Sequence, residues 1–429
     1  MKLTASSHSP APHGNVLIMT LVFFGIVALT TAGYLSLARS RTLIRARSLA
    51  WNSAIPVAEA GIEEAFTHIK HDSAALTANG WTNGTVAGQP VLTKSRTFPD
   101  GSYFAVKLYG TTNIYSTGFV PAPLNPGQYI SRIVKITGFY PPLINVAFAA
   151  VYSIQMDGDG LASNSFDSSK TNLSTDGHYD PSKTSTNGNV ASVNGPVDFG
   201  NHSIAGNLYL GPDVVNSSVS SSQVSGQIYN DFNVSFPDAE LPATLWSAAP
   251  IPTMVAGSMV QNFTSSGDYF TADSNDNILV QPGVTVRLRV DATSFSPNDV
   301  HILETNGVSG TLMIYQVSGS CNLRGSGSPD VDSGRARNFW YYGLPGVTSI
   351  TYGGNSSFTG VIYAPGADLK LNGGGADLKL NGGGANIGLI GSSITKTITM
   401  NGHYDFHFDE DLLTSGPSRG FVLDSWREL

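Results

Sequence analysis

The stretch that decides the architecture of this chain is Val16–Ala38, which reads VLIMTLVFFGIVALTTAGYLSLA and contains no charged residue. As a helix, these 23 positions are about 35 Å long, because each residue adds about 1.5 Å along the axis. That length is enough to cross the hydrocarbon core of a bilayer. Four arginines follow at once, namely Arg39, Arg41, Arg45 and Arg47. The sequence therefore predicts one membrane-spanning helix near the N-terminus, followed by a long and largely polar remainder.

The helical pattern continues beyond the arginines into an amphipathic second half. Its apolar positions recur every three or four residues and form one stripe, at Ile55, Ala58, Ile62, Phe66 and Ile69. Pro56 interrupts this pattern, so we expect it to kink the helix or to divide it in two. The sequence predicts a helix over residues 15–70, embedded in the membrane first and packed on a folded domain second.

The rest of the chain has the texture of a mainly β protein. Between residues 71 and 142, strand-like runs separated by turn residues indicate a small antiparallel sheet, which ends at Pro141-Pro142. From residue 143 to residue 413, short apolar alternations are separated by Gly, Asn, Asp and Ser. This pattern favours a parallel β-helix or solenoid, with a β-sandwich as the second choice. Residues 414–429 are expected to form a C-terminal tail.

The composition limits the classes of partner and cofactor. Charged residues make up 13% of the chain and the net charge is −8. No basic cluster occurs beyond the four arginines, which argues against a nucleic-acid partner. Cys321 is the only cysteine, so neither an intrachain disulfide nor a multi-cysteine zinc site can form.

One nine-residue unit, ADLKLNGGG, occurs twice in succession, as residues 367–375 and 376–384. Each copy reads as a short strand closed by a glycine turn, with its leucines on one face and its Asp and Lys on the other. Stacked copies would add faces to a solenoid, whereas a duplicated solvent loop is equally compatible with the pattern. A calcium-binding nonapeptide does not fit, because Ala376 replaces a glycine and Asp377 is displaced by one position.

A second pattern, near the C-terminus, combines potential metal ligands with aromatic residues: His403, Asp405, His407 and Asp409 alternate with Tyr404, Phe406 and Phe408. On a strand the four polar side chains share one face, and zinc or manganese accepts these ligand types. However, neighbours two positions apart on a strand are about 6.6 Å apart, which is wide for ligands of one ion. We therefore predict a solvent-exposed polar face over an aromatic core. The four polar residues remain metal candidates, and no cofactor is predicted.

The sequence argues for a binding or structural protein rather than an enzyme. The aromatic run Phe339–Tyr342 is more typical of a core strand than of a surface that binds a sugar or a partner. The chain contains no G-x-S-x-G, H-E-x-x-H or P-loop motif. Polysaccharide lyases and hydrolases also use β-helices, but they need clustered carboxylates or basic residues in a groove. An anchored or secreted carbohydrate-active enzyme on a β-helix scaffold remains the alternative function, because enzymes of this class share the predicted fold.

The N-terminal quarter resembles the minor pilins of type IV pili, with a PilX-type N-terminal region. The residues that carry the resemblance are Gly14 before the apolar helix, the arginines after it, and the run Ala58–Ala65, AEAGIEEA. The resemblance implies a leader over residues 1–14 that a prepilin peptidase removes between Gly14 and Asn15. It also implies that the helix packs against other pilin-like subunits. Many pilins have Glu at the fifth mature position, where this chain has Met19, and Phe at the first, so a minor component fits better than a bulk subunit.

The C-terminal half resembles uncharacterised repetitive β domains of bacterial surface proteins, for example in Phe358–Pro365 and Met400–Glu410. We therefore expect a pilin-like structural or adhesive surface protein, with the membrane and surface polysaccharide as further partners. The arginines after the helix would by themselves keep the C-terminus in the cytoplasm. Large domains can translocate despite such charges, and the low-charge texture suits the exterior, so we expect an N-terminal anchor and export to the periplasm or cell surface. A secretory signal peptide cut near Ala32 or Ala38 is the alternative.

Overall fold

The computed structural model describes residues 15–72, 76–110, 112–157, 159–215, 218–324, 329–353, 357–372, 388–401 and 404–429. The chain is mainly β and divides into two compact units. The anchor unit contains the residues up to Pro141 together with Arg419–Leu429, and the solenoid unit contains Pro142–Ser418. The solenoid unit is therefore an insertion within the anchor unit.

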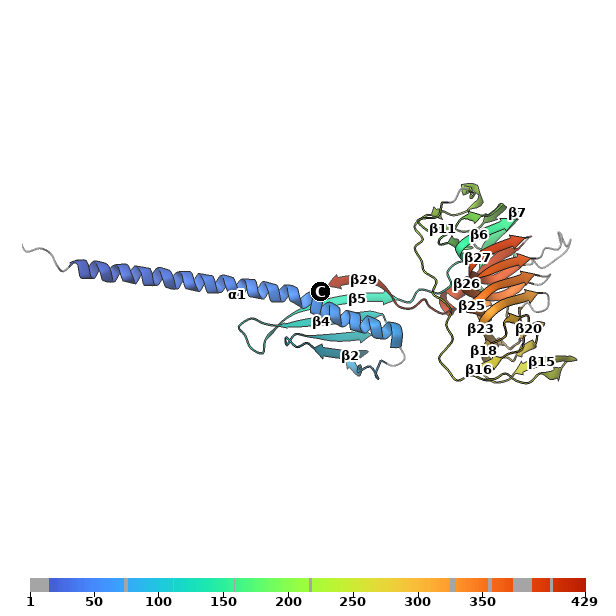
Figure 1. Ribbon diagram of the computed structural model, residues 1–429, viewed down its shortest axis with the longest axis horizontal. Helices are drawn as coiled ribbons and strands as arrows, with labels where there is room; N and C mark the ends of the chain where they lie inside the picture. The colour runs from blue at the N-terminus through green and yellow to red at the C-terminus, as the bar shows by residue number, and fades with distance from the viewer. Residues whose placement is uncertain are drawn as a thin grey trace, which may run out of the picture. The chain divides into compact units, whose positions relative to one another are not determined.

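The anchor unit begins with helix α1, Asn15–Asp72, which is 58 residues long (Figure 1). Its apolar N-terminal part is exposed, and within the described residues it is the one helix with the length and composition to cross a membrane. Of the predicted stripe, Ala58, Ile62 and Ile69 are buried against a sheet, whereas Ile55 and Phe66 are half-buried.

Pro56 does not divide the helix in two, because α1 continues through it. Ala54 and Ala58, on either side of Pro56, are fully buried. Gly118 lies directly beneath them, and a Cβ on Gly118 would collide with the Ala54 carbonyl oxygen and the Ala58 amide. Close packing on both sides of the proline thus keeps the helix continuous although one backbone hydrogen bond is lost.

Helix α1 packs on a six-stranded antiparallel sheet in the order β1-β2-β3-β4-β5-β29. The strands are β1 (Thr82–Val86), β2 (Gln89–Thr97), β3 (Tyr103–Tyr109), β4 (Asn113–Pro121), β5 (Tyr129–Phe139) and β29 (Val422–Glu428). The sheet face under the helix carries the buried residues Phe104, Val106, Leu108, Ile114, Val134 and Ile136.

The C-terminal tail expected over residues 414–429 is instead largely structured, because Val422–Glu428 form the edge strand β29. Strand β29 pairs with β5, with Trp426 opposite Ile136. Its seven residues are all exposed and show no apolar alternation, so the local pattern does not indicate a strand. Pairing with a strand almost 300 residues earlier determines its structure.

The solenoid unit is a parallel β-solenoid, as predicted, whose main sheet has the order β12-β11-β8-β6-β27-β26-β25-β23-β18-β16-β13. The first half-solenoid contains β6 (Phe148–Asp157), β7 (Asp159–Phe166), β8 (Val190–Ser192), β9 (Val197–Asp198), β10 (Asn201–Ile204), β11 (Leu208–Leu210) and β12 (Ile228–Tyr229). The main strands of the second half-solenoid are β13 (Ser247–Ala248), β16 (Gly267–Thr271), β18 (Thr285–Val290), β23 (Thr311–Arg324), β25 (Phe339–Gly353), β26 (Phe358–Asn372) and β27 (Gly388–Asn401).

Further strands of the second half-solenoid form its other faces. A five-stranded sheet, β14-β15-β17-β20-β24, contains β14 (Thr253–Val255), β15 (Ser258–Phe263), β17 (Asn277–Val280), β20 (Asp299–Ile302) and β24 (Pro329–Val331). The remaining elements are β19 (Ser294–Phe295), the hairpin β21 (Glu304–Thr305) and β22 (Val308–Ser309), β28 (Asp405–Asp409), the short helix α2 (Leu412–Ser415), and two 3-10 turns, η2 (Ser221–Gln223) and η4 (Ala336–Asn338).

The chain enters and leaves this solenoid in its middle. It begins with β6, winds outward to β12 at one end, and crosses over residues 230–246 to β13 at the other end. It then winds back until β27 pairs with β6 and β28 pairs with β7 (Figure 1). The crossing segment lies against β26, because the Tyr363 hydroxyl donates to the Pro237 carbonyl oxygen at 2.6 Å. We call the β6/β27 and β7/β28 contacts the seam.

The two chain crossings between the units lie side by side. The Leu143 amide donates to the Pro417 carbonyl oxygen at 2.7 Å, and Pro142 forms an antiparallel bridge with Ser418. On the other side of this bridge, the Arg419 amide donates to the Pro141 carbonyl oxygen at 2.9 Å. The crossings thus form a two-stranded ribbon.

The core of the solenoid consists of inward-facing apolar residues in register between rungs, such as Ile314, Tyr341 and Ile362. The first copy of the duplicated unit is part of this core. Its Leu369 and Leu371 lie on β26 and are fully buried, while Lys370 between them is exposed. The second copy, residues 376–384, lies outside the described residues.

Candidate binding site

The predicted cluster on β28 does not form an exposed face. Asp405 is half-buried, whereas His407 and Asp409 are 1% and 0% exposed, and Phe406 and Phe408 are also buried. Both faces of β28 are covered, since Tyr179 stacks on the His407 ring at a centroid distance of 3.7 Å. His403, like Gly14, lies outside the described residues. The prediction of a solvent-exposed polar face was therefore wrong.

His407 is held as a neutral side chain at the seam. Its Nδ1 lies 2.7 Å from Asn164 Oδ1, on the paired strand β7, so Nδ1 carries the proton and donates it. Burial lowers the pKa of His407 to about 3. Its Nε2 faces the backbone of Gly388 and has no hydrogen-bond partner in the described part of the chain. The ring packs and orients β28.

Asp409 joins three segments at the same seam. Its carboxylate accepts backbone N–H groups of Ser168 at 3.0 Å, of Ala336 at 3.2 Å and of Asp411 at 3.2 Å. Burial raises the pKa of Asp409 to about 6, although these donors favour the charged form. These hydrogen bonds connect the two half-solenoids. They do not bring Asp409 together with the other predicted metal ligands into one site.

A different group of potential metal ligands occurs among the described residues, namely His301, Asp330 and Asp332, whose ligand atoms lie within 4.8 Å of one another. His301 Nε2 lies 2.7 Å from Asp332 Oδ1, and Asp332 Oδ2 accepts the Glu304 amide at 3.0 Å. The sequence did not indicate this group, because its members come from different rungs. Pairing of β20 with β24 and the loop contact to Glu304 account for the arrangement.

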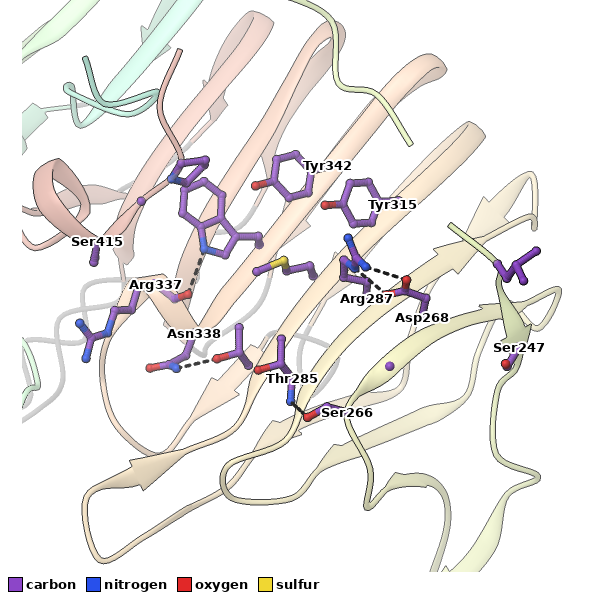
Figure 2. A pocket seen from close by; sticks show the side chains of 17 residues that line it. Ser247, Ser266, Asp268, Thr285, Arg287, Tyr315, Arg337, Asn338, Tyr342 and Ser415 are labelled. Atoms are coloured by element: carbon purple, nitrogen blue, oxygen red, sulfur yellow. Dashed lines mark hydrogen bonds and ion pairs between the residues drawn. The ribbon is translucent and has the colours of Figure 1, made fainter. Parts of the chain in front are cut away.

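The described part of the solenoid also contains a pocket of about 1050 Å³ over β16, β18, β23 and β25 (Figure 2). Typical small-molecule pockets measure roughly 300–1,000 Å³. Its lining combines aromatic, hydroxyl, amide and charged side chains: Leu245, Ser247, Ser266, Gly267, Asp268, Thr285, Arg287, Thr311, Met313, Tyr315, Arg337, Asn338, Trp340, Tyr342, Ser415, Gly416 and Pro417. We call it the aromatic pocket.

The floor of the aromatic pocket is built from two rows of residues in register across parallel strands. One row runs Asp268, Arg287, Met313 and Trp340, and the second includes Tyr315 and Tyr342. The Tyr315 and Tyr342 rings stack with a centroid distance of 4.8 Å and an interplanar angle of 12°. That distance equals the spacing between neighbouring strands, so stacking of rungs sets the geometry of the floor.

The charged groups of the aromatic pocket are already paired. Arg287 donates to Asp268 with Nε at 2.5 Å and Nη2 at 2.6 Å, in a two-pronged ion pair (Figure 2). Arg337 lies 3.3 Å from the carboxylate of Asp411, which is buried beside the pocket. Because these pairs neutralise one another, the pocket presents little net charge.

Several hydroxyl groups of the aromatic pocket remain available. Those of Ser247, Thr285, Tyr315 and Tyr342 form no hydrogen bond within the described residues. Figure 2 shows the hydroxyls of Tyr315 and Tyr342 on the same side of their rings. Burial raises the pKa of both phenols, so both remain protonated at neutral pH and can donate. The pocket can therefore hydrogen-bond a neutral ligand while its rings contact apolar surface.

Sequence reasoning found only part of this pocket. The aromatic run on β25 places Phe339 and Tyr341 inward, fully buried, while Trp340 and Tyr342 face the pocket. The core interpretation is thus confirmed for Phe339, Tyr341 and Trp340, which is 2% exposed, while Tyr342 is half-buried. The other contributors, such as Asp268 and Arg287, come from other rungs.

Comparison with known proteins finds one part of the solenoid similar to a family. Residues 249–415 match the family described as a domain of unknown function (DUF7305). This range runs from just before β14 to the end of α2, and so corresponds to the second half-solenoid and its seam strand β28. None of the curated proteins and none of the solved structures matches the chain.

Proposed function

We propose that this protein is a pilin-like, non-catalytic display protein of the cell envelope, a minor component of a type IV pilus or a related system. Its N-terminal helix would hold it in the membrane and against other pilin-like subunits, and its solenoid would act in adhesion outside. A prepilin peptidase would release the leader by cutting between Gly14 and Asn15.

The observation that carries this proposal is the division of α1 into two parts. The part from Val16 to Leu37 exposes large apolar side chains, for example Leu17 at 75% and Leu29 at 76%. Such a surface needs lipid or other helices around it. The part beyond Ala50 is instead covered by the antiparallel sheet of the anchor unit. An assembly helix that carries a folded domain at its C-terminal end has this division.

The aromatic pocket supports the adhesive rather than the enzymatic alternative. Of the residues that line it, Asp268 is the one carboxylate, and Arg287 already neutralises it. Glycoside hydrolysis generally requires two carboxyl groups placed on either side of the bond. An assay of reducing-end release with the purified protein and its Asp268→Asn variant tests this point: turnover that the substitution abolishes would establish the enzyme instead.

Processing is tested by comparing the mass and N-terminal sequence of the envelope-fractionated wild type with those of Gly14→Leu. We expect the wild type to begin at Asn15 and the variant to keep its leader. Gly25→Leu is the matched control, because Gly25 lies within α1 with no neighbouring atom within 4 Å of its Cβ position, and this variant should be processed normally. A wild type that begins after Ala32 or Ala38, or equal processing of both variants, would contradict the pilin-like proposal.

A further inference from the structure

We propose that the aromatic pocket of the second half-solenoid binds a segment of a neutral oligosaccharide. This inference rests on the proposed adhesive function and names the ligand class of its display domain. It is drawn from the charge balance, hydroxyl groups, ring arrangement and strand pairing of the pocket.

The charge balance selects a neutral ligand. The Arg287–Asp268 pair uses both prongs of the guanidinium, and Arg337 is paired with Asp411. An anionic ligand would have to displace a carboxylate from one of these arginines, and a cationic ligand would have to displace an arginine from its carboxylate. A neutral ligand leaves both pairs intact and can still hydrogen-bond their outer edges.

The lining groups suit a polyhydroxylated ligand. Each of the four unpaired hydroxyls, on Ser247, Thr285, Tyr315 and Tyr342, can both donate and accept, as can each hydroxyl of a sugar. The half-buried Tyr342 ring offers apolar surface to the C–H face of a sugar ring, and Tyr315 and Trp340, 8% and 2% exposed, extend this surface at its edges. A purely apolar ligand would leave these hydroxyls without partners, which is costly in a partly buried site.

The strand pairing argues against a peptide as the ligand. Extended peptides bind most readily by adding a strand to an unpaired sheet edge. The floor strands β18, β23 and β25 have a paired strand on each side, and β16 pairs with β18 along its length and with β13 at Tyr269 and Phe270, so the floor leaves little free strand edge. Recognition must therefore come from side chains. The volume of about 1050 Å³ is slightly above the usual range and fits several linked sugar units rather than one.

The test is calorimetric titration of the full-length protein, purified in a zwitterionic detergent that has no sugar head group. The ligands are maltohexaose, cellohexaose, laminarihexaose and mannohexaose, with a hexagalacturonate and an unstructured hexapeptide as the charged-sugar and peptide arms. We expect at least one neutral hexasaccharide to bind, with an affinity unchanged between 0.15 M and 1 M salt.

The double variant Tyr315→Phe and Tyr342→Phe keeps both rings and removes only the hydroxyls. We expect it to lower the affinity about tenfold or more. Thr285→Val, at an exposed pocket position, should weaken binding in the same direction and serves if the double variant does not fold. Tyr152→Phe is the matched control, since Tyr152 is a 51% exposed tyrosine of β6 that does not line the pocket, and it should bind as the wild type does.

Binding of the hexagalacturonate or the peptide alone, binding of no neutral hexasaccharide, or neutral binding that neither pocket variant weakens would each overturn the proposal. Oligosaccharide binding by the purified protein does not depend on where the leader is cleaved or on how the protein is inserted in the membrane. Failure here is therefore distinguishable from failure of the proposed envelope function, which the Gly14→Leu experiment measures separately.

Discussion

The two half-solenoids stack their rungs by different means. In the first, strands β8 to β12 are only two to four residues long. In the second, β23, β25, β26 and β27 are 14 or 15 residues long. Both halves use the same parallel pairing, so the difference lies in what holds one rung on the next.

The first half-solenoid uses backbone contact and amide side chains. Gly188, Gly206 and Gly226 lie on successive rungs, and a Cβ on Gly206 would be 2.7 Å from the Gly188 carbonyl carbon. Beside them, the backbone N–H of Asn207 donates to the side-chain oxygen Oδ1 of Asn189 at 2.8 Å. The backbone N–H of Gln227 donates in the same way to Asn207 Oδ1 at 2.9 Å. Small residues and an asparagine ladder thus allow short rungs to approach closely.

The second half-solenoid uses large side chains on both faces of its sheet. Ile314, Tyr341 and Ile362 stack in register on the inside, and Tyr315 and Tyr342 stack on the outside. Large side chains need wide rungs, and wide rungs leave enough outer surface for a pocket. The pocket therefore lies on the half-solenoid in which side chains, rather than backbone contacts, support the stacking.

The largest expected effect concerns the core of the second half-solenoid. Ile362→Asp places an unpaired carboxyl group at a fully buried position, which should lower the free energy of unfolding by more than about 4 kcal/mol. Thermal and urea unfolding of the full-length protein in detergent measures the loss. Lys370→Asp, at an exposed position of the same strand, is the control and should change stability by less than about 0.5 kcal/mol. An equal loss of unfolding free energy in both variants would contradict the assignment of Ile362 to the core and of Lys370 to the surface.

The next effect concerns the glycines of the first half-solenoid. Gly206→Ala forces a methyl group against the backbone of Gly188 and Asn189, so we expect a loss of about 3 kcal/mol. The control is Gly366→Ala on β26, where a Cβ would meet no atom within 4 Å and which should be near neutral. Urea unfolding of both variants under the same conditions measures the two free energies of unfolding. A Gly206→Ala protein as stable as the control would show that backbone contact is dispensable.

The smallest effect concerns the seam and depends on pH. The pKa of His407 is lowered to about 3 in the folded state, against about 6.5 in the unfolded state, so protonation favours the unfolded chain. This contribution is fully present above about pH 6.5 and is lost as the pH falls toward 3. At about 1.4 kcal/mol per pH unit, the wild type should lose about 2 kcal/mol relative to His407→Phe between pH 7 and pH 5.

The comparison with His407→Phe isolates the histidine, because Asp409 titrates in both proteins. The raised pKa of Asp409 acts in the opposite direction, since it lowers stability as the pH rises from about 4 to about 6. Urea unfolding at pH 7, 6 and 5 gives the difference between wild type and variant. A difference that stays constant with pH would mean that His407 is not held neutral at the seam.

Those features of the fold that depend on local patterns could be predicted from the sequence. The charge-free run before Arg39 and the stripe ending at Ile69 predicted the long helix, and punctuated alternations predicted the solenoid. The winding order could not be predicted, because β6 pairs with β27 about 240 residues later. The local sequence of neither strand indicates which strand it pairs with. Strand β29 could not be predicted for the same reason, because its partner β5 also lies far away in the sequence.

The candidate site followed the same division. The sequence analysis interpreted the aromatic run Phe339–Tyr342 as a core strand. The pocket forms because Tyr315, Arg287 and Asp268 of other rungs lie in register with this run. The prediction of an exposed polar face on β28 failed because Tyr179, more than 200 residues upstream, covers His407. Alternation along one strand indicates which residues share a face. It does not indicate whether a distant segment of the chain covers the polar face.

The ribbon formed by the two chain crossings has a consequence for the release of the solenoid by proteolysis. Secreted proteases cut exposed linkers, and a domain on a single linker is shed by one cut. Here a cut next to Pro142 would leave the solenoid joined through Arg419 to β29, which stays paired with β5. A cut next to Ser418 would leave it covalently attached through β5. A single cut therefore does not free the solenoid directly, because the other crossing still holds it, either covalently or by strand pairing.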